Sequence, residues 1–138
     1  MKHWVIDTNV VVSGLLNPSG APARVLDAVV RGQVRMVYDA RILREYRDVL
    51  HRPKFKLGAD LIDAFLESLR GQLLVNPKLI SVTGPDPDDL IFIEAALSVP
   101  DMTLVTGNLV HFPVGTRNGV RVINPAEACA ELKPTKSR

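Results

Sequence analysis

The stretch VRMVYDARILREYRDVLH, residues 34–51, contains both kinds of regular structure expected in this chain. Apolar side chains alternate along residues 34–38, which predicts a β-strand. Asp39 is a suitable N-cap for a helix over residues 40–51, and Pro53 ends that helix. A strand that passes directly into a helix is the repeating unit of parallel α/β sheets.

Strands and helices continue to alternate on both sides of this unit. Short extended segments are predicted at residues 4–6, 73–75, 80–82, 103–106 and 120–123. Helices are predicted at residues 21–31, 59–71 and 87–98 and after Asn124-Pro125. Strands separated by such helices pair in parallel, with helices on both faces of the sheet. The sequence therefore predicts the α/β class, as a three-layer α/β/α sandwich with a central, mostly parallel sheet.

Length and composition indicate one domain. With 138 residues, 46% of them apolar and 23% charged, the chain can bury a single core. We expect one domain over residues 1–132 and a flexible C-terminal tail over residues 133–138. The single cysteine, Cys129, excludes an internal disulfide, and no apolar run has the length of a signal peptide or a membrane span. These features indicate a cytoplasmic protein without a membrane partner.

Charged residues are distributed unevenly, although the net charge is only +2. Six basic residues fall within one short stretch: Arg41, Arg44, Arg47, Arg52, Lys54 and Lys56. Acids gather in another, Asp86-Pro87-Asp88-Asp89. An acidic pocket beside a basic rim suits the cleavage of a phosphate polymer, and solvated helix faces produce the same pattern.

Four acid or amide residues each follow a predicted strand or lie in or near the first turns of a predicted helix: Asp7, Glu45, Asp89 and Asn108. The carboxyl ends of parallel strands meet at one edge of a sheet, where Asp7 and Asn108 would fall. Glu45 emerges beside the apolar stripe of its helix, where a carboxylate is poorly hydrated unless a cation pairs with it. Carboxylates gathered in one place repel each other, and a hard divalent ion is the usual reason for such a gathering.

The run Asp86-Pro87-Asp88-Asp89 has a structural explanation as well. Asp86 as N-cap, Pro87 at the first helical position and acids in the first turn are what helix capping favours. Capping explains three acids less well, because the helix behind them is apolar nearly all round and is expected to be buried. We therefore favour Asp89 as a metal ligand, with Asp88 as the alternative.

Polar neighbours of these acids are further candidates. Thr8 and Asn9 favour a turn after Asp7, so Asp7 could also serve as a local cap. Asn108 could be a turn former, or its amide oxygen could coordinate Mg²⁺ or orient a water. Thr106 and Asn9 are possible members of the same site.

Other residues that often carry chemistry show no supporting pattern. His3, His51 and His111 lack metal-like spacing and are interpreted as packing or surface residues. The sequence has no glycine-rich phosphate loop and no nucleophile elbow, so serine or cysteine catalysis is unsupported.

Taken together, four motifs in this order resemble a PIN-domain protein: VIDTNV (5–10), ILREYRDVL (42–50) through RPKF (52–55), DPDD (86–89) and LVTGN (104–108). More narrowly, the chain resembles toxin components of toxin–antitoxin pairs, relatives of the VapC-type ribonucleases. This resemblance implies a Mg²⁺- or Mn²⁺-dependent endoribonuclease, often dimeric, whose partner is a small antitoxin that folds over the active-site groove.

Mapped by motif, the resemblance makes Asp7 the first metal-binding acid, Glu45 the second and Asp89 the third. Asn108 stands where many family members have Asp, which lowers the negative charge of the site by one. Under this hypothesis the bound ion activates a water for attack on an RNA phosphodiester, while Asn108 and Thr106 position water or phosphate.

Two other functions stay open from the sequence. A catalytically weakened domain would act as an RNA- or protein-binding module, as Asn108 and the modest net charge suggest. Phosphoryl transfer through an aspartyl intermediate would use Asp7, but it needs a second acid where this chain has Asn9.

Overall fold

The computed structural model describes residues 1–77, 79–80 and 86–132, and a parallel sheet forms the centre of these residues. The five strands are β1 (Lys2–Ile6), β2 (Val34–Tyr38), β3 (Leu73–Leu74), β4 (Thr103–Val105) and β5 (Arg121–Ile123). Their order in the sheet is β3-β2-β1-β4-β5, and each neighbouring pair is parallel. The predicted α/β class and central parallel sheet are confirmed.

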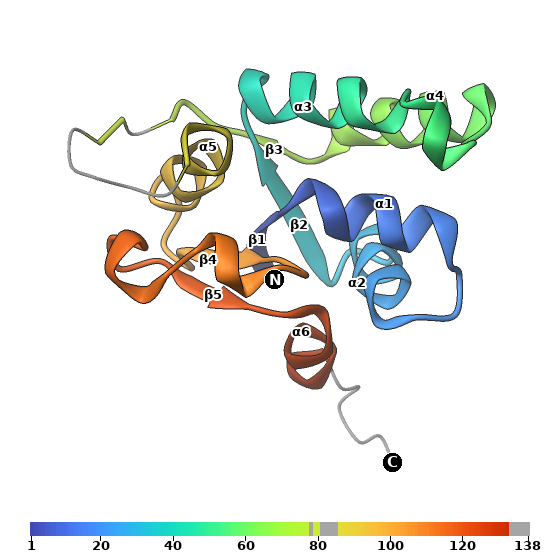
Figure 1. Cartoon of the computed structure of the whole chain (residues 1–138). Coiled ribbons are helices and arrows are strands. Elements are labelled where there is room, and N and C mark those ends of the chain that lie inside the picture. The colour runs from blue at the N-terminus through green and yellow to red at the C-terminus, as the bar shows by residue number, and fades with distance from the viewer. Residues whose placement is uncertain (78, 81–85, 133–138) are drawn as a thin grey trace, which may run out of the picture.

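Helices surround the sheet on both faces. They are α1 (Thr8–Leu16), α2 (Ala21–Val30), α3 (Ala40–Leu50), α4 (Ala59–Ser68), α5 (Pro87–Ala96) and α6 (Pro125–Glu131). Figure 1 shows α5 on one side of the sheet and α1, α2 and α6 on the other, with α3 and α4 at the carboxyl end of β2. Since α3 packs against both α1 and α5, it closes the top of the sandwich in that view.

Short 3-10 turns connect several of these elements: η1 (Pro53–Phe55), η2 (Leu69–Gly71), η3 (Leu109–His111) and η4 (Val114–Thr116). The predicted helix 59–71 is thus α4 followed by η2. The other predicted elements agree with the observed ones to within two residues at each end, and the predicted strand 34–38 is β2 itself. Residues 80–82 were predicted to be extended, but Ile80 lies in no strand, and Ser81 and Val82 are outside the described residues.

The prediction of a turn after Asp7 was wrong, because Thr8 and Asn9 begin α1. Val10, Val11 and Val12 of this helix are buried in the core. Valine has a modest helix propensity, but burial of an apolar face outweighs that preference.

Large apolar side chains from every layer fill the core. Trp4, Tyr46, Phe92 and Phe112 are among the largest fully buried residues. Cα partners between β1 and β4 run from Trp4 opposite Thr103 to Ile6 opposite Val105, so both strands end at the same level. No described helix has the length and apolar character needed to cross a membrane.

Candidate functional site

Asp7 lies at the point where the strand order of the sheet reverses. β1 lies between β2 and β4, and open parallel sheets bind ligands outside the carboxyl ends of their strands at such a point. The backbone N–H of Asp7 donates to the carbonyl oxygen of Val105 over 2.9 Å. The hydroxyl of Thr106 donates to Oδ2 of Asp7 over 2.8 Å. Two neighbouring strands therefore bring Asp7 and Thr106 together.

The carboxyl group of Asp7 is buried, and its residue is only 5% exposed. Burial raises its pKa from 3.8 to about 6; the hydrogen bond from Thr106 opposes that rise, and the negative charges of Asp89 and Glu45 add to it. Asp7 is the N-cap residue of α1 but makes no side-chain capping bond. Local capping, one of the two interpretations of Asp7, does not account for this carboxylate.

Glu45 lies near Asp7 because the residue after it anchors α3 to β1. The buried hydroxyl of Tyr46 donates to the carbonyl oxygen of Ile6 over 2.5 Å. The hydroxyl of Thr8 donates to Oε2 of Glu45 over 3.3 Å. Burial raises the pKa of Glu45, and the hydrogen bond from Thr8 opposes that rise.

The first turn of α5 gives its three acids different roles. The Asp86 side chain accepts a hydrogen bond from the backbone N–H of Asp88 over 3.2 Å, so capping accounts for Asp86. Asp89 lines the same pocket as Asp7 and Glu45, whereas Asp88 is exposed and outside that lining. Burial raises the pKa of Asp89 as well. The arrangement favours Asp89 over Asp88 as the third acid.

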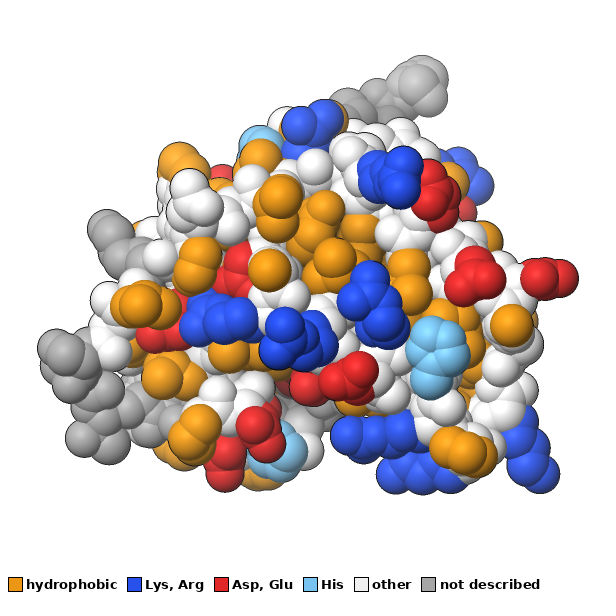
Figure 2. Space-filling view, turned by 90° about the horizontal axis from the view of Figure 1, so that it is seen from above, with side chains coloured by type: hydrophobic (Ala, Val, Ile, Leu, Met, Phe, Trp, Pro, Cys, Tyr) orange, Lys and Arg blue, Asp and Glu red, His pale blue; other side chains and the backbone are white. Residues whose placement is uncertain are grey.

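These three acids share an open cavity of about 420 Å³, called the acid pocket below. It is lined by Asp7, Thr8, Asn9, Val12, Ser13, Glu45, Val49, Arg52, Phe55, Asp89 and His111. Figure 2 looks onto the molecule from the side of α3 and α4 and shows acidic side chains close beside Lys and Arg side chains. Arg52 is the member of the predicted basic rim that lines the pocket.

Asn9 and Asn108 make hydrogen bonds around Asp7 and Thr106. Nδ2 of Asn9 donates to Oδ2 of Asp7 over 3.4 Å, and its Oδ1 accepts from the backbone N–H of Gly107 over 3.0 Å. The backbone N–H of Asn108 donates to the Thr106 hydroxyl oxygen over 3.1 Å. Asn108 does not line the acid pocket; it contacts His111, which does.

His111, which the sequence indicated to be a packing or surface residue, is exposed and also lines the acid pocket. Its Nδ1 lies 3.5 Å from Oδ2 of Asp89, and its Nε2 lies 3.0 Å from Nδ2 of Asn108. Asn108 is the N-cap residue of η3, and His111 is the third residue of that turn. A 3-10 turn aligns residues i and i+3, so a predicted turn after Asn108 would have been the signal that connects the two.

Arg41 was assigned to the basic rim, but it makes internal ion pairs instead. Its Nη2 lies 2.9 Å from Oδ2 of Asp39, and its Nη1 lies 2.6 Å from Oε1 of Glu94. Both acids are buried, at 1% and 4% exposure. Arg41 therefore ties α3, which carries Glu45, to α5, which carries Asp89.

The donor set of the acid pocket suits a hard divalent cation. Carboxylate, amide and hydroxyl oxygens are the ligands that Mg²⁺ and Mn²⁺ prefer. Within residues 1–77, 79–80 and 86–132, however, no three His, Cys, Asp or Glu side chains are arranged to hold a metal ion. Asp7, Glu45 and Asp89 line one pocket without converging on one point.

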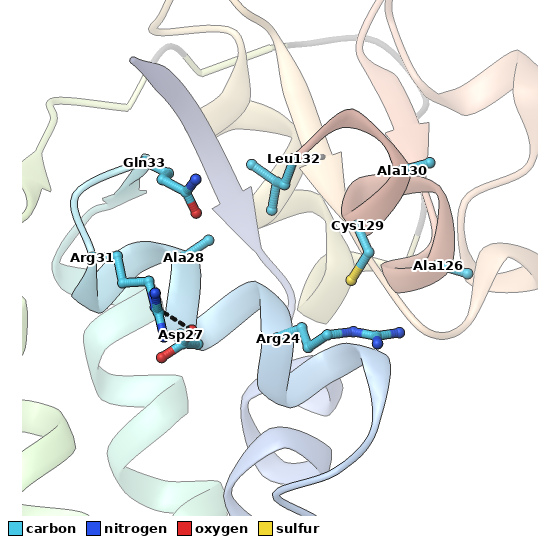
Figure 3. Close-up of a pocket in the computed structure, with 9 residues that line it drawn as sticks. All are labelled: Arg24, Asp27, Ala28, Arg31, Gln33, Ala126, Cys129, Ala130 and Leu132. Atoms are coloured by element: carbon cyan, nitrogen blue, oxygen red, sulfur yellow. Dashed lines mark hydrogen bonds and ion pairs between the residues drawn. The ribbon is translucent and has the colours of Figure 1, made fainter. Parts of the chain in front are cut away.

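A larger cavity, of about 500 Å³, lies between α2 and α6. Figure 3 shows the residues that line it: Arg24, Asp27, Ala28, Arg31, Gln33, Ala126, Cys129, Ala130 and Leu132. Its one acid, Asp27, is already paired with Arg31 at 2.6 Å. The cavity offers no cluster of reactive groups, so its size does not make it the reaction centre.

Comparison with known proteins identifies a family for most of the chain. The family profile described as PIN domain matches residues 3–109. The uncharacterized protein MJ1680 of Methanocaldococcus jannaschii is 30% identical over 96 residues, which are 67% of this chain and 62% of that protein. The chain thus spans less than two thirds of that relative's length. No solved structure matches the chain.

Proposed function

This chain belongs to the PIN-domain family, whose members are generally nucleases, and from that premise we propose that it is a divalent-metal-dependent endoribonuclease and the toxin of a toxin–antitoxin pair. The observation that supports the proposal most is the acid pocket, where Asp7, which follows β1, meets Glu45 of α3 and Asp89 of α5. The negative charges of Glu45 and Asp89 raise the pKa of Asp7, and a bound cation would relieve this repulsion.

The proposed mechanism uses Asp7, Glu45 and Asp89 to hold Mg²⁺ or Mn²⁺. When bound, the ion would lower the pKa of a water and neutralise charge on the scissile phosphate. Thr106 donates to one oxygen of Asp7 and Thr8 donates to one oxygen of Glu45, and each bond restricts its carboxylate. No side-chain nucleophile is required.

Other residues would handle the substrate. Arg52 lines the acid pocket and would bind an RNA phosphate next to the acids. Asn108 and His111 would position water or phosphate from the side of Asp89, whose Oδ2 lies 3.5 Å from Nδ1 of His111.

Resemblance to toxin components of toxin–antitoxin pairs supports the remaining parts of the proposal. These are a cognate antitoxin that covers the acid pocket, a homodimer and a cytoplasmic location. Inspection of the gene beside this one would test the antitoxin directly, because toxin and antitoxin form a pair.

The decisive variant is Asp7→Asn, with Asp48→Asn as its matched control. Asp48 is an exposed acid on α3 that lies outside the acid pocket. We expect Asp7→Asn to abolish cleavage of RNA in Mn²⁺ and the heat of Mn²⁺ binding in calorimetry, while circular dichroism shows the native fold. Asp48→Asn should keep both RNA cleavage and the heat of Mn²⁺ binding. Retained cleavage by Asp7→Asn, in nuclease-free preparations, would reject the proposal.

The second candidate is a catalytically weakened PIN domain that binds RNA or a protein. Two observations favour it. Asn108 stands where many PIN-domain proteins have Asp. In the described part of the chain, Asp7, Glu45 and Asp89 do not converge on one metal position. This candidate predicts no Mn²⁺ binding by the native chain. An Asn108→Asp variant that gains RNase activity would indicate loss of a once fuller site.

A further inference from the structure

Phe55 lies on the wall of the acid pocket, in η1, which is separated from the end of α3 by two residues. Phe55 is half-buried, and part of it packs against the core. Nζ of Lys54 lies 5.1 Å from the centre of the ring. Arg52 also lines the pocket, and both basic residues are exposed. The segment from Arg52 to Phe55 therefore brings two exposed positive charges and an aromatic ring together, with the Lys54 ammonium over the ring and Phe55 and Arg52 in the same pocket wall as Glu45.

An unpaired nucleotide offers the groups that match this surface. Its base has a flat face that stacks on an aromatic ring, and the phosphates on either side of it attract Lys and Arg. Bases within a duplex are already stacked on both faces and expose only their edges, so a duplex cannot use the ring. An acidic peptide would pair with the charges but has no general need for the ring.

We propose that Phe55 stacks on one base of single-stranded RNA while Arg52 and Lys54 bind the neighbouring phosphates, so that this turn selects unpaired RNA for the acid pocket. The identity of the ligand as RNA rests on the proposed nuclease function. Stacking itself needs no metal ion and no cleavage, so it can be measured separately.

A purely structural role for Phe55 makes a different prediction. Leu fills most of the volume of Phe but lacks a π face, so Phe55→Leu should preserve the packing and remove the stacking. Phe55→Tyr keeps the ring and should preserve both. Lys56 follows at an exposed position outside the acid pocket, so Lys56→Gln is the control for a general loss of charge.

The experiment is fluorescence anisotropy in EDTA at low salt, with RNA integrity checked on a gel. The probes are labelled oligoadenylate, its duplex with oligouridylate, and a ribose-phosphate oligomer of equal length without bases. The native chain should bind oligoadenylate most tightly. Phe55→Leu should weaken that binding roughly 5- to 150-fold, the range expected for loss of one stacked base, and leave the baseless oligomer unaffected. Phe55→Tyr should bind as the native chain does.

A second variant reports contact directly and does not depend on the Leu variant folding. In F55W the new indole should lose fluorescence when oligoadenylate binds but not when the baseless oligomer binds, whereas the native Trp4 is buried and should not respond. Equal affinity of the native chain for all three probes, or an equal loss on all three in Phe55→Leu, would overturn the inference.

Failure of this inference and failure of the nuclease proposal look different. Base-dependent binding without any metal-dependent cleavage would reject the nuclease and keep the stacking role of Phe55. Cleavage by a protein that binds the three probes equally would reject the stacking role and keep the nuclease.

Discussion

Single side chains set the electrostatics of the site, and Asp7 dominates them. Its burial alone would favour the neutral acid, and the charges of Asp89 and Glu45 act in the same direction. A group in this state costs stability whenever it is ionised in the absence of a cation. Two predictions follow from its raised pKa.

The first concerns stability without metal. Because the folded pKa of Asp7, about 6, exceeds its ordinary 3.8, Asp7 stabilises the fold fully below pH 3.8, and this contribution is lost as pH rises to about 6. The total is of order 3 kcal/mol, from about 1.4 kcal/mol per pKa unit. Asp7→Asn should therefore be more stable than the native chain at pH 7 and not at pH 3.5, as measured by urea unfolding in EDTA. Parallel stability curves for the two proteins would contradict this.

The second concerns metal affinity and rests on the proposed function. Asp7 must lose its proton to bind a cation, so Mn²⁺ affinity should rise with pH and level off above about 6. Below that value, release of one proton predicts about a tenfold fall per pH unit. Calorimetry from pH 5 to pH 7.5 tests this, with Asp48→Asn expected to follow the native curve. Affinity independent of pH would exclude Asp7 as a ligand.

Between elements, ion pairs and hydrogen bonds set the distance from one acid to the next. Tyr46 holds α3 against β1, and Arg41 holds α3 against α5. Glu94 also accepts a hydrogen bond from the backbone N–H of Ile80 over 3.1 Å, so this buried acid connects the chain before α5 as well. These contacts arrange the helices that carry Glu45 and Asp89.

Arg41→Ala tests this arrangement. The change leaves Asp39 and Glu94 as buried acids without their cation, which costs about 3–5 kcal/mol for a fully buried pair. Since the Arg41 side chain is 35% exposed, we expect a loss nearer about 2–3 kcal/mol by urea unfolding. Arg44→Ala removes an exposed arginine from the same helix and should change stability by less than about 0.5 kcal/mol. Equal effects of the two variants would show that the ion pairs contribute nothing.

At the level of the complete chain, the sheet order places the acid pocket at one end of the sandwich. β1 and β4 lie side by side and end at the same level, so their following residues, Asp7 and Thr106, meet across the reversal point. α3 and α5 approach this end from different parts of the sequence. The remaining prediction concerns where the folded unit ends.

We expect residues 1–132 to fold as one domain without residues 133–138. The removed segment, KPTKSR, contains no large apolar side chain, so its loss should change the free energy of unfolding by less than about 0.5 kcal/mol. A chain that ends at residue 120 lacks β5 and α6 and should lose cooperative unfolding. Calorimetric melting of the two truncated chains tests both statements, and a large loss on removal of residues 133–138 would contradict the proposed boundary.

Local patterns in the sequence were sufficient for the class of fold and for most of its elements. The alternation at residues 34–38 and the cap at Asp39 are short-range signals, and they predicted β2 and α3 almost to the residue. Helix α1 as a whole escaped prediction, because turn-forming Thr8 and Asn9 were outweighed by the burial of the valines that follow.

Contacts between residues far apart in the sequence were decided by the packing of the folded chain alone. Arg41 and Glu94 lie 53 positions apart, and no periodicity connects them. His111 of η3 lies 3.5 Å from Asp89 of α5, although the two residues are 22 positions apart in the sequence. The sequence indicated which acids to consider, since strand ends and helix starts are local features. Their burial and raised pKa values arose from the solvent-excluding contacts of the folded chain, because desolvation depends on every element that surrounds a group.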